Sequence, residues 1–139
     1  MRNSLRIFFH WTLVILWAGM IFLSSSVSSF AVFFGPSAGA AKSSDWISGT
    51  VHVVIYSILC FLLIIAFRSL KTPFGKSLLF SFLLSLLYGV SDELHQYFVP
   101  GREMHLSDWL LDALGSYLIV GIYSYQKMRK KKTPPRIVA

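Results

Sequence analysis

Four apolar stretches, each long enough to cross a lipid bilayer, constrain the fold of this chain more than any other feature. They cover about Ile7–Leu23, Ile47–Phe67, Phe74–Gln96 and Ser107–Tyr125. A helix needs roughly 20 mostly apolar residues to cross the hydrocarbon core of a bilayer. It also satisfies its own backbone hydrogen bonds there. The sequence therefore predicts an all-α integral membrane bundle of four transmembrane helices.

The composition supports the membrane class and sets the domain organisation. Of the 139 residues, 55% are hydrophobic and only 14% are charged, whereas a soluble domain carries about 25% charge. We predict one four-helix domain over residues 1–126, followed by a basic cytoplasmic tail over residues 127–139. Arg2 and Arg6 resemble the start of a signal peptide, but the apolar run after them exceeds the usual h-region of about 7–15 residues. We expect this first helix to be retained.

The distribution of lysine and arginine sets the expected orientation, because cytoplasmic connections carry an excess of basic residues. Basic residues gather before the first apolar run, between the second and third, and after the fourth. The other two connections hold only Lys42 and Arg102. Both termini are therefore predicted to be cytoplasmic.

The net charge of +7 could indicate nucleic acid, but no nucleic-acid recognition motif accompanies it. The basic tail directly follows an apolar run, which is typical of a topology determinant or of contact with anionic lipid. Membrane lipids are thus the expected partners, with no nucleic acid, and the oligomeric state is left open. Cys60 is the only cysteine, so it forms no intrachain disulfide, and we interpret it as a small core residue.

Apart from Asp45, every acidic residue of the chain lies within residues 91–112, between two apolar runs. Carboxylates this close to hydrocarbon are costly unless they are paired, hydrated or coordinating something. Helical spacing places Asp92 and Gln96 on one face of the third helix, and Asp108 and Asp112 on one stripe of the fourth. A short connection with a turn signal joins these helices, so they are expected to be antiparallel neighbours whose polar stripes face each other.

Other residues are expected to complete a polar pocket at the outer face. Arg102 lies between the two helices and can bridge carboxylates or hold an anionic ligand in a bidentate manner. An alternative is an ion pair that only fixes the helix hairpin. His52 and Tyr56, spaced i and i+4 on the second helix, can form a third wall. The predicted ligand-binding residues are His52, Tyr56, Asp92, Glu93, Gln96, Arg102, Asp108 and Asp112.

Three further interpretations concern residues near this pocket. Glu103 and His105 are expected to be solvated bystanders in the connection. Gly89, Gly115 and Gly121 are expected to permit close helix packing rather than to bind a ligand. A divalent metal site is chemically conceivable from carboxylates and histidine, but no HExxH or similar spacing is present. We therefore assign no metal ligand and no cofactor.

The signature of the third and fourth helices resembles that of the VanZ-like family. The resemblance rests on Glu93, Gln96, Pro100-Gly101-Arg102 and Asp108, with Tyr88-Gly89, Phe98, Ser107 and Gly115 around them. His52 and Tyr56, and the Ser24-Ser25-Ser26 end of the first helix, also match the family pattern. Asp112 departs from it, because asparagine is often expected there, and the extra negative charge casts doubt on a ligand contact carried over to Asp112.

This resemblance implies a small, multi-pass protein of the bacterial inner (cytoplasmic) membrane. It also implies an association with glycopeptide resistance, chiefly to teicoplanin. Our first hypothesis is a non-enzymatic envelope protein that binds a cell-wall precursor, a lipid headgroup or a glycopeptide. The alternative is a membrane enzyme acting on a lipid-linked substrate, with Glu93 or Asp108 as the candidate catalytic acid–base group. A proton- or ion-coupled transporter ranks third, because the inner halves of the helices are mainly apolar.

Overall fold

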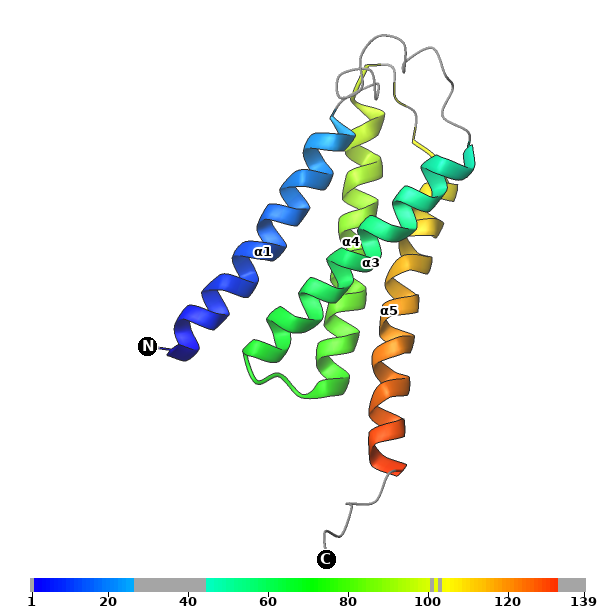
Figure 1. Ribbon diagram of the computed structural model, residues 1–139. Coiled ribbons are helices and arrows are strands. Elements are labelled where there is room, and N and C mark those ends of the chain that lie inside the picture. Colours follow the sequence, from blue (N-terminus) through cyan, green and yellow to red (C-terminus); the bar gives the residue numbers. More distant parts are fainter. Residues whose placement is uncertain (1, 27–44, 101, 103, 133–139) are drawn as a thin grey trace, which may run out of the picture.

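The computed structural model describes residues 2–26, 45–100, 102 and 104–132, and in this part of the chain all regular secondary structure is helical (Figure 1). The helices are α1 (Arg2–Ser25), α3 (Asp45–Ser69), α4 (Phe74–Tyr97) and α5 (Leu106–Lys132). Each predicted apolar stretch lies inside one helix, so the all-α prediction is confirmed. Helix α5 runs on through Lys127 to Lys132, so the first part of the predicted tail is helical.

Three of these helices are long and apolar enough to cross a membrane: α1, α3 and α4, over Asn3–Ser25, Gly49–Ser69 and Phe74–Tyr97. Helix α5 is long enough but is not among these apolar helices. Its first half carries Asp108 and Asp112, and its last turns are rich in lysine and arginine. A fourth span and the cytoplasmic location of the termini therefore stay predictions.

The bundle is apolar on its outside and partly polar inside. Large apolar side chains on all four helices are exposed, among them Leu16, Leu83 and Leu118. In α4, by contrast, Ser77, Ser81 and Ser85 follow one another at a spacing of four residues and are all fully buried. An apolar exterior around a polar interior suits a lipid surrounding. We call these three residues the serine stripe of α4.

Helix α3 is central: both α3 and α4 contact each of the other three helices, and the contacts of α3 are the more extensive. Tyr56, Leu59 and Leu63 pack on Val14 and Ile21 of α1. On another side of α3, Cys60 and Ile64 pack against Leu78 of α4. Cys60 is thus the small core residue predicted from the sequence.

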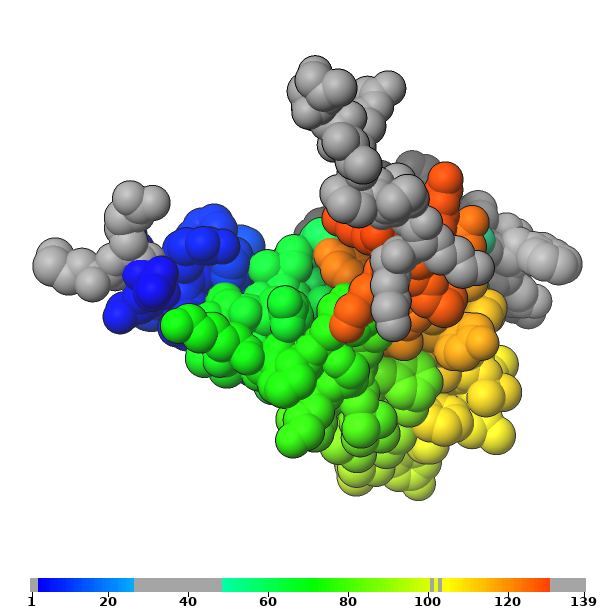
Figure 2. Space-filling model, turned by 90° about the horizontal axis from the view of Figure 1, so that it is seen from below, coloured from blue at the N-terminus to red at the C-terminus, as the bar shows by residue number. Residues whose placement is uncertain are grey.

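Helix α1 lies at one edge of the bundle. It contacts α3 and α4, and within the described residues it makes no contact with α5 (Figures 1 and 2). Two side chains attach it through backbone carbonyls: Trp17 Nε1 donates to Ile55 at 3.0 Å, and the Tyr88 hydroxyl donates to Ala18. The first turn of α1, the α3–α4 connection and the last turn of α5 lie at one end of the bundle, which we call the termini end (Figure 1). The opposite end is the cluster end.

Two glycines permit close helix packing, as predicted, and one does not. A Cβ at Gly115 would overlap the carbonyl oxygen of Val53 on α3 and lie 3.1 Å from Ser57 Oγ. The same Ser57 hydroxyl donates to the Gly115 carbonyl at 3.0 Å. A Cβ at Gly89 would lie 3.2 Å from Asp112 Oδ2. The prediction was wrong for Gly121, which has no such neighbour within 4 Å because it faces outward.

Candidate functional site

The polar residues predicted from the sequence converge at the cluster end. His52 lies near the start of α3, Asp92, Glu93 and Gln96 in the last two turns of α4, and Asp108 and Asp112 in the first two turns of α5. The four residues Asp92, Glu93, Gln96 and Asp112 are at most 4% exposed. We call the set the polar cluster; its members are His52, Tyr56, Asp92, Glu93, Gln96, Asp108 and Asp112.

His52 connects α3 to the acidic stripe of α5. Its Nδ1 lies 2.9 Å from Asp112 Oδ1, and its Nε2 lies 3.8 Å from Asp108 Oδ2. The His52 side chain is 12% exposed, whereas that of Asp112 is fully buried. One imidazole therefore lies between two carboxylates of successive turns, which makes α3 the third wall expected from the sequence.

Glu93 is held by the connection between α4 and α5. Its Oε2 accepts a hydrogen bond of 2.9 Å from the backbone N–H of His105. Gln96 Nε2 donates to Asp92 Oδ2 at 3.1 Å and lies 3.5 Å from Glu93 Oε1. His105 is therefore not only a solvated bystander, as the sequence suggested, because its backbone N–H holds one oxygen of Glu93.

Helix α1 contributes partners that the sequence did not assign to the site. Ser25 Oγ donates to Asp92 Oδ1 at 2.6 Å, and Ser26 Oγ lies 2.9 Å from His95 Nε2. The His95 ring also stacks on Phe22, with 4.3 Å between the ring centroids. The run of serines at the end of the first apolar stretch could have indicated these contacts, but it was used only as part of the family resemblance.

Arg102 lies beside the C-terminal end of α1, where its Nη2 donates to the carbonyl oxygen of Ser24 at 3.1 Å. A guanidinium suits this place, because the last carbonyls of a helix carry partial negative charge. Within the described residues, Asp108 and Asp112 lie within ion-pair distance of His52, whose imidazole carries a charge only when it is protonated. Arg102 is thus anchored at α1, at the edge of the cluster end.

Helix α5 begins at Leu106, one residue before the expected start, so Ser107 lies in the first turn and donates to Asp108 Oδ1 at 3.3 Å. Asp108 also lies in that first turn, where the helix dipole favours an anion. Trp109 Nε1 donates to the carbonyl oxygen of Leu86 at 3.3 Å. The Trp109 hydrogen bond ties the start of α5 to α4, next to Asp108 and one turn before Asp112.

Two buried atoms of the polar cluster have no hydrogen-bond partner within the described residues. They are the Tyr56 hydroxyl oxygen and Asp112 Oδ2, and both residues are 0% exposed. A buried polar atom without a partner costs about 1–3 kcal/mol, more for a charged group. Both residues border Gly89, since a Cβ there would lie 3.2 Å from Asp112 Oδ2 and 3.4 Å from Tyr56 Cε1. Asp112 Oδ2 and the Tyr56 ring therefore pack closely on the backbone of Gly89, where even a methyl group would be crowded.

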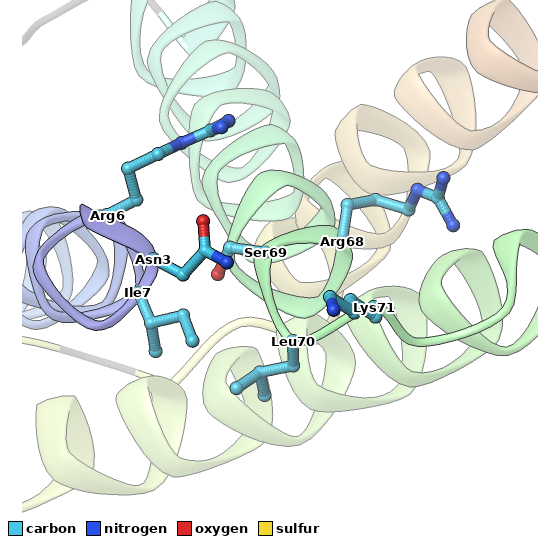
Figure 3. A pocket seen from close by; sticks show the side chains of 7 residues that line it. All are labelled: Asn3, Arg6, Ile7, Arg68, Ser69, Leu70 and Lys71. Atoms are coloured by element: carbon cyan, nitrogen blue, oxygen red, sulfur yellow. The ribbon is translucent and has the colours of Figure 1, made fainter. Parts of the chain in front are cut away.

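A separate pocket of about 430 Å³ lies at the termini end (Figure 3). It is lined by Asn3, Arg6, Ile7, Arg68, Ser69, Leu70 and Lys71. Figure 3 shows the guanidinium groups of Arg6 and Arg68 well separated and not directed at each other. No residue of the polar cluster lines this pocket, and its basic groups do not converge on one anion.

The fold and the site define a class of protein: a helical bundle with membrane-span helices that carries carboxylates and a histidine buried at one end. Within that class the chain belongs to the VanZ/LLP1 family, whose family model matches residues 9–127. The match includes the whole polar cluster and Arg102, so the resemblance noted from the sequence is confirmed. Comparisons with curated proteins and with solved structures found no match.

Proposed function

We propose that this chain is a multi-pass binding protein of the bacterial inner membrane, with both termini in the cytoplasm and the cluster end outward. It binds the polar headgroup of a lipid-linked cell-wall precursor, or a glycopeptide, at the polar cluster. A role in resistance to glycopeptides such as teicoplanin would follow from that binding. The observation that carries the proposal is the burial of Asp92, Glu93 and Asp112 at the ends of membrane-span helices.

The chemistry of the cluster supports a ligand rich in hydroxyl, amide and ammonium groups. Carboxylate oxygens accept hydrogen bonds from such donors, and the Gln96 side chain can both donate and accept. A guanidinium such as that of Arg102, which donates to the Ser24 carbonyl, is suited to bind a phosphate or carboxylate of the same ligand. Ionisable residues inside a membrane bundle are rare and typically mark a functional site.

Binding is favoured over the enzymatic alternative by the surroundings of the two candidate acid–base groups. Glu93 is 1% exposed and has one oxygen engaged by the N–H of His105. Asp108 is more accessible, with its side chain 23% exposed, but it lies beside the imidazole of His52. A general acid–base must come within hydrogen-bond reach of a substrate, and buried Glu93 supports a role in positioning rather than proton transfer.

The proposal is tested with the full chain in lipid nanodiscs and two probes, teicoplanin and a polyprenyl-linked muropeptide precursor. Arg102→Ala is expected to weaken binding at least tenfold, because a hydrogen bond to a charged group contributes about 1.5–3 kcal/mol. Arg68→Ala removes the same type of side chain at the termini end and is expected to bind as the wild type does. Thermal shift and thermophoresis give the affinities, and mass spectrometry of the probe reports turnover.

Equal affinities of Arg102→Ala and the wild type would contradict the proposed role of Arg102. Failure of the wild type to bind either probe would contradict the proposed function. Conversion of the precursor that Glu93→Gln abolishes would establish the enzymatic alternative instead.

A further inference from the structure

Three potential metal ligands meet at the centre of the polar cluster. One ligand atom each from His52, Glu93 and Asp112 lies within 4.8 Å of the other two. These residues come from α3, α4 and α5, so the site exists only when the three helices are packed together. Glu93 and Asp112 are buried and His52 is largely so. A bound ion would therefore be held away from bulk water.

Each of the two carboxylates, Asp112 and Glu93, has one oxygen held by a partner and one oxygen that can coordinate an ion. Asp112 Oδ1 is engaged by His52, but Asp112 Oδ2 is fully buried and has no hydrogen-bond partner within the described residues. Glu93 shows the same division, since the N–H of His105 holds Oε2 while the 3.5 Å contact from Gln96 to Oε1 is long. Partners that fix one oxygen of a ligating carboxylate are typical of metal sites, where they orient the ligand.

The negative charge of the cluster favours a divalent cation. Two buried carboxylates at close range repel each other, and each loses hydration in the bundle interior. A single imidazole, even when protonated, compensates only one of the carboxylates around it. A dication bound by Glu93 and Asp112 would neutralise both and would give Asp112 Oδ2 its missing partner.

The donor set indicates the class of ion. One imidazole nitrogen with two carboxylate oxygens suits Zn²⁺ or a neighbouring first-row transition metal better than Mg²⁺ or Ca²⁺, which prefer oxygen ligands alone. Zn²⁺ binds such atoms at about 2.0–2.2 Å, so ligand atoms of a tetrahedral site lie about 3.4 Å apart. The three ligand atoms lie within 4.8 Å of one another, so the side chains would have to rotate inward to reach that separation. The buried Tyr56 hydroxyl of the same cluster also has no hydrogen-bond partner within the described residues.

We propose that His52, Glu93 and Asp112 form a binding site for one divalent transition-metal ion, with Zn²⁺ as the best match. The inference deepens the proposed function, on which it rests for its biological role. A cluster of four carboxylates would repel an anionic headgroup, and a dication at its centre would instead attract the phosphate or carboxylate of the ligand. Three protein ligands leave a fourth coordination position open for that group.

The test measures the metal alone on the full chain in nanodiscs, after treatment with a chelator. The wild type is expected to retain about one Zn²⁺ per chain after gel filtration, measured by elemental mass spectrometry, because three protein ligands hold the ion. Titration with Co²⁺ should produce visible absorption bands of low-symmetry coordination. His52→Gln and Asp112→Asn are each expected to weaken binding at least a hundredfold, since even outer-shell changes cost about 10–100-fold. His10→Gln, which removes a histidine elsewhere on α1, should bind as the wild type does.

The variants are first checked for helical circular dichroism and an unchanged elution volume. If Asp112→Asn does not fold, His52→Gln and Glu93→Gln replace it as test variants. The metal content of the wild type tests the inference independently of any variant. Wild-type protein that retains no stoichiometric metal, or folded variants with wild-type affinity, would overturn the inference. Arg102→Ala separates the two proposals: it should keep the ion and lose the headgroup probe. Metal binding without binding of either probe would support the metal site and contradict the proposed function.

Discussion

The contact between α3 and α5 at Gly115 offers the sharpest test of the packing. Replacing Gly115 by alanine would drive a Cβ into the carbonyl oxygen of Val53 and to 3.0 Å from its carbonyl carbon. The obstacle is backbone, so no side-chain rotation relieves it and the helices must separate. Overpacking of this kind costs about 1–3 kcal/mol. Loss of the Ser57–Gly115 hydrogen bond adds roughly 0.6 kcal/mol, the average for such bonds in membrane bundles. We expect Gly115→Ala to destabilise the protein by about 2–3 kcal/mol.

The matched control is Gly121→Ala, two turns along the same helix, where a Cβ meets nothing within 4 Å. Reversible unfolding of both variants in mixed micelles with increasing dodecyl sulfate, followed by tryptophan fluorescence and circular dichroism, gives the two free energies. Gly121→Ala should be neutral or slightly stabilising, because alanine has the higher helix propensity. Equal stability of Gly115→Ala and Gly121→Ala would refute the close approach of α3 and α5 at Gly115.

Three other predictions follow from contacts of the polar cluster and from the topology. Ser25→Ala removes the 2.6 Å donor to Asp92 and should lower the free energy of unfolding by about 1–3 kcal/mol. Within the described residues the Ser24 hydroxyl bonds its own helix at the Ile21 carbonyl, so Ser24→Ala should change that free energy far less, and equal losses would contradict the role of Ser25. Gly89→Ala places a methyl group 3.2 Å from Asp112 Oδ2. It should weaken Co²⁺ binding, followed by visible absorption, at least tenfold, an effect of about 1.4 kcal/mol. An unchanged Co²⁺ affinity would count against metal binding at Asp112. Met104→Cys should react with an impermeant maleimide on intact cells, whereas Met128→Cys should react only after permeabilisation. The reverse pattern would refute cytoplasmic termini.

Within the described residues, apolar run length predicted well which stretches form helices, because the cost of exposing a backbone to lipid leaves few other structures. The fourth run was harder to judge. Its Asp108, Asp112 and buried Ser116 face the bundle, so its average hydropathy understates how apolar its outward face is. Length therefore predicted α5 as a helix, while its crossing of the membrane stays a prediction.

Helical spacing predicted which residues share a face, but not which neighbouring helix they meet. Asp92 and Gln96 do share a face and are hydrogen-bonded to each other. Asp92 also meets Ser25 of α1, a contact that depends on the position of a helix far away in the sequence. The metal ligands escaped motif searching for the same reason, since His52, Glu93 and Asp112 lie on three different helices. Gly121 shows a different error: it was expected to permit close helix packing as Gly89 and Gly115 do, but it lies on the exposed side of α5.

The serine stripe of α4 has a consequence for how the protein is made. Ser77, Ser81 and Ser85 continue the buried face that ends in Asp92 and Glu93, so one whole side of α4 is unsuited to lipid. A nascent chain that stops at Tyr97 would present this side to the bilayer, with α3 and α1 covering only part of it. Helix α5 completes the cover through contacts such as the Ser85–Ser116 hydrogen bond of 2.8 Å. We therefore expect stable integration of α4 to await the synthesis of α5, so that α4 and α5 act as one unit during membrane insertion.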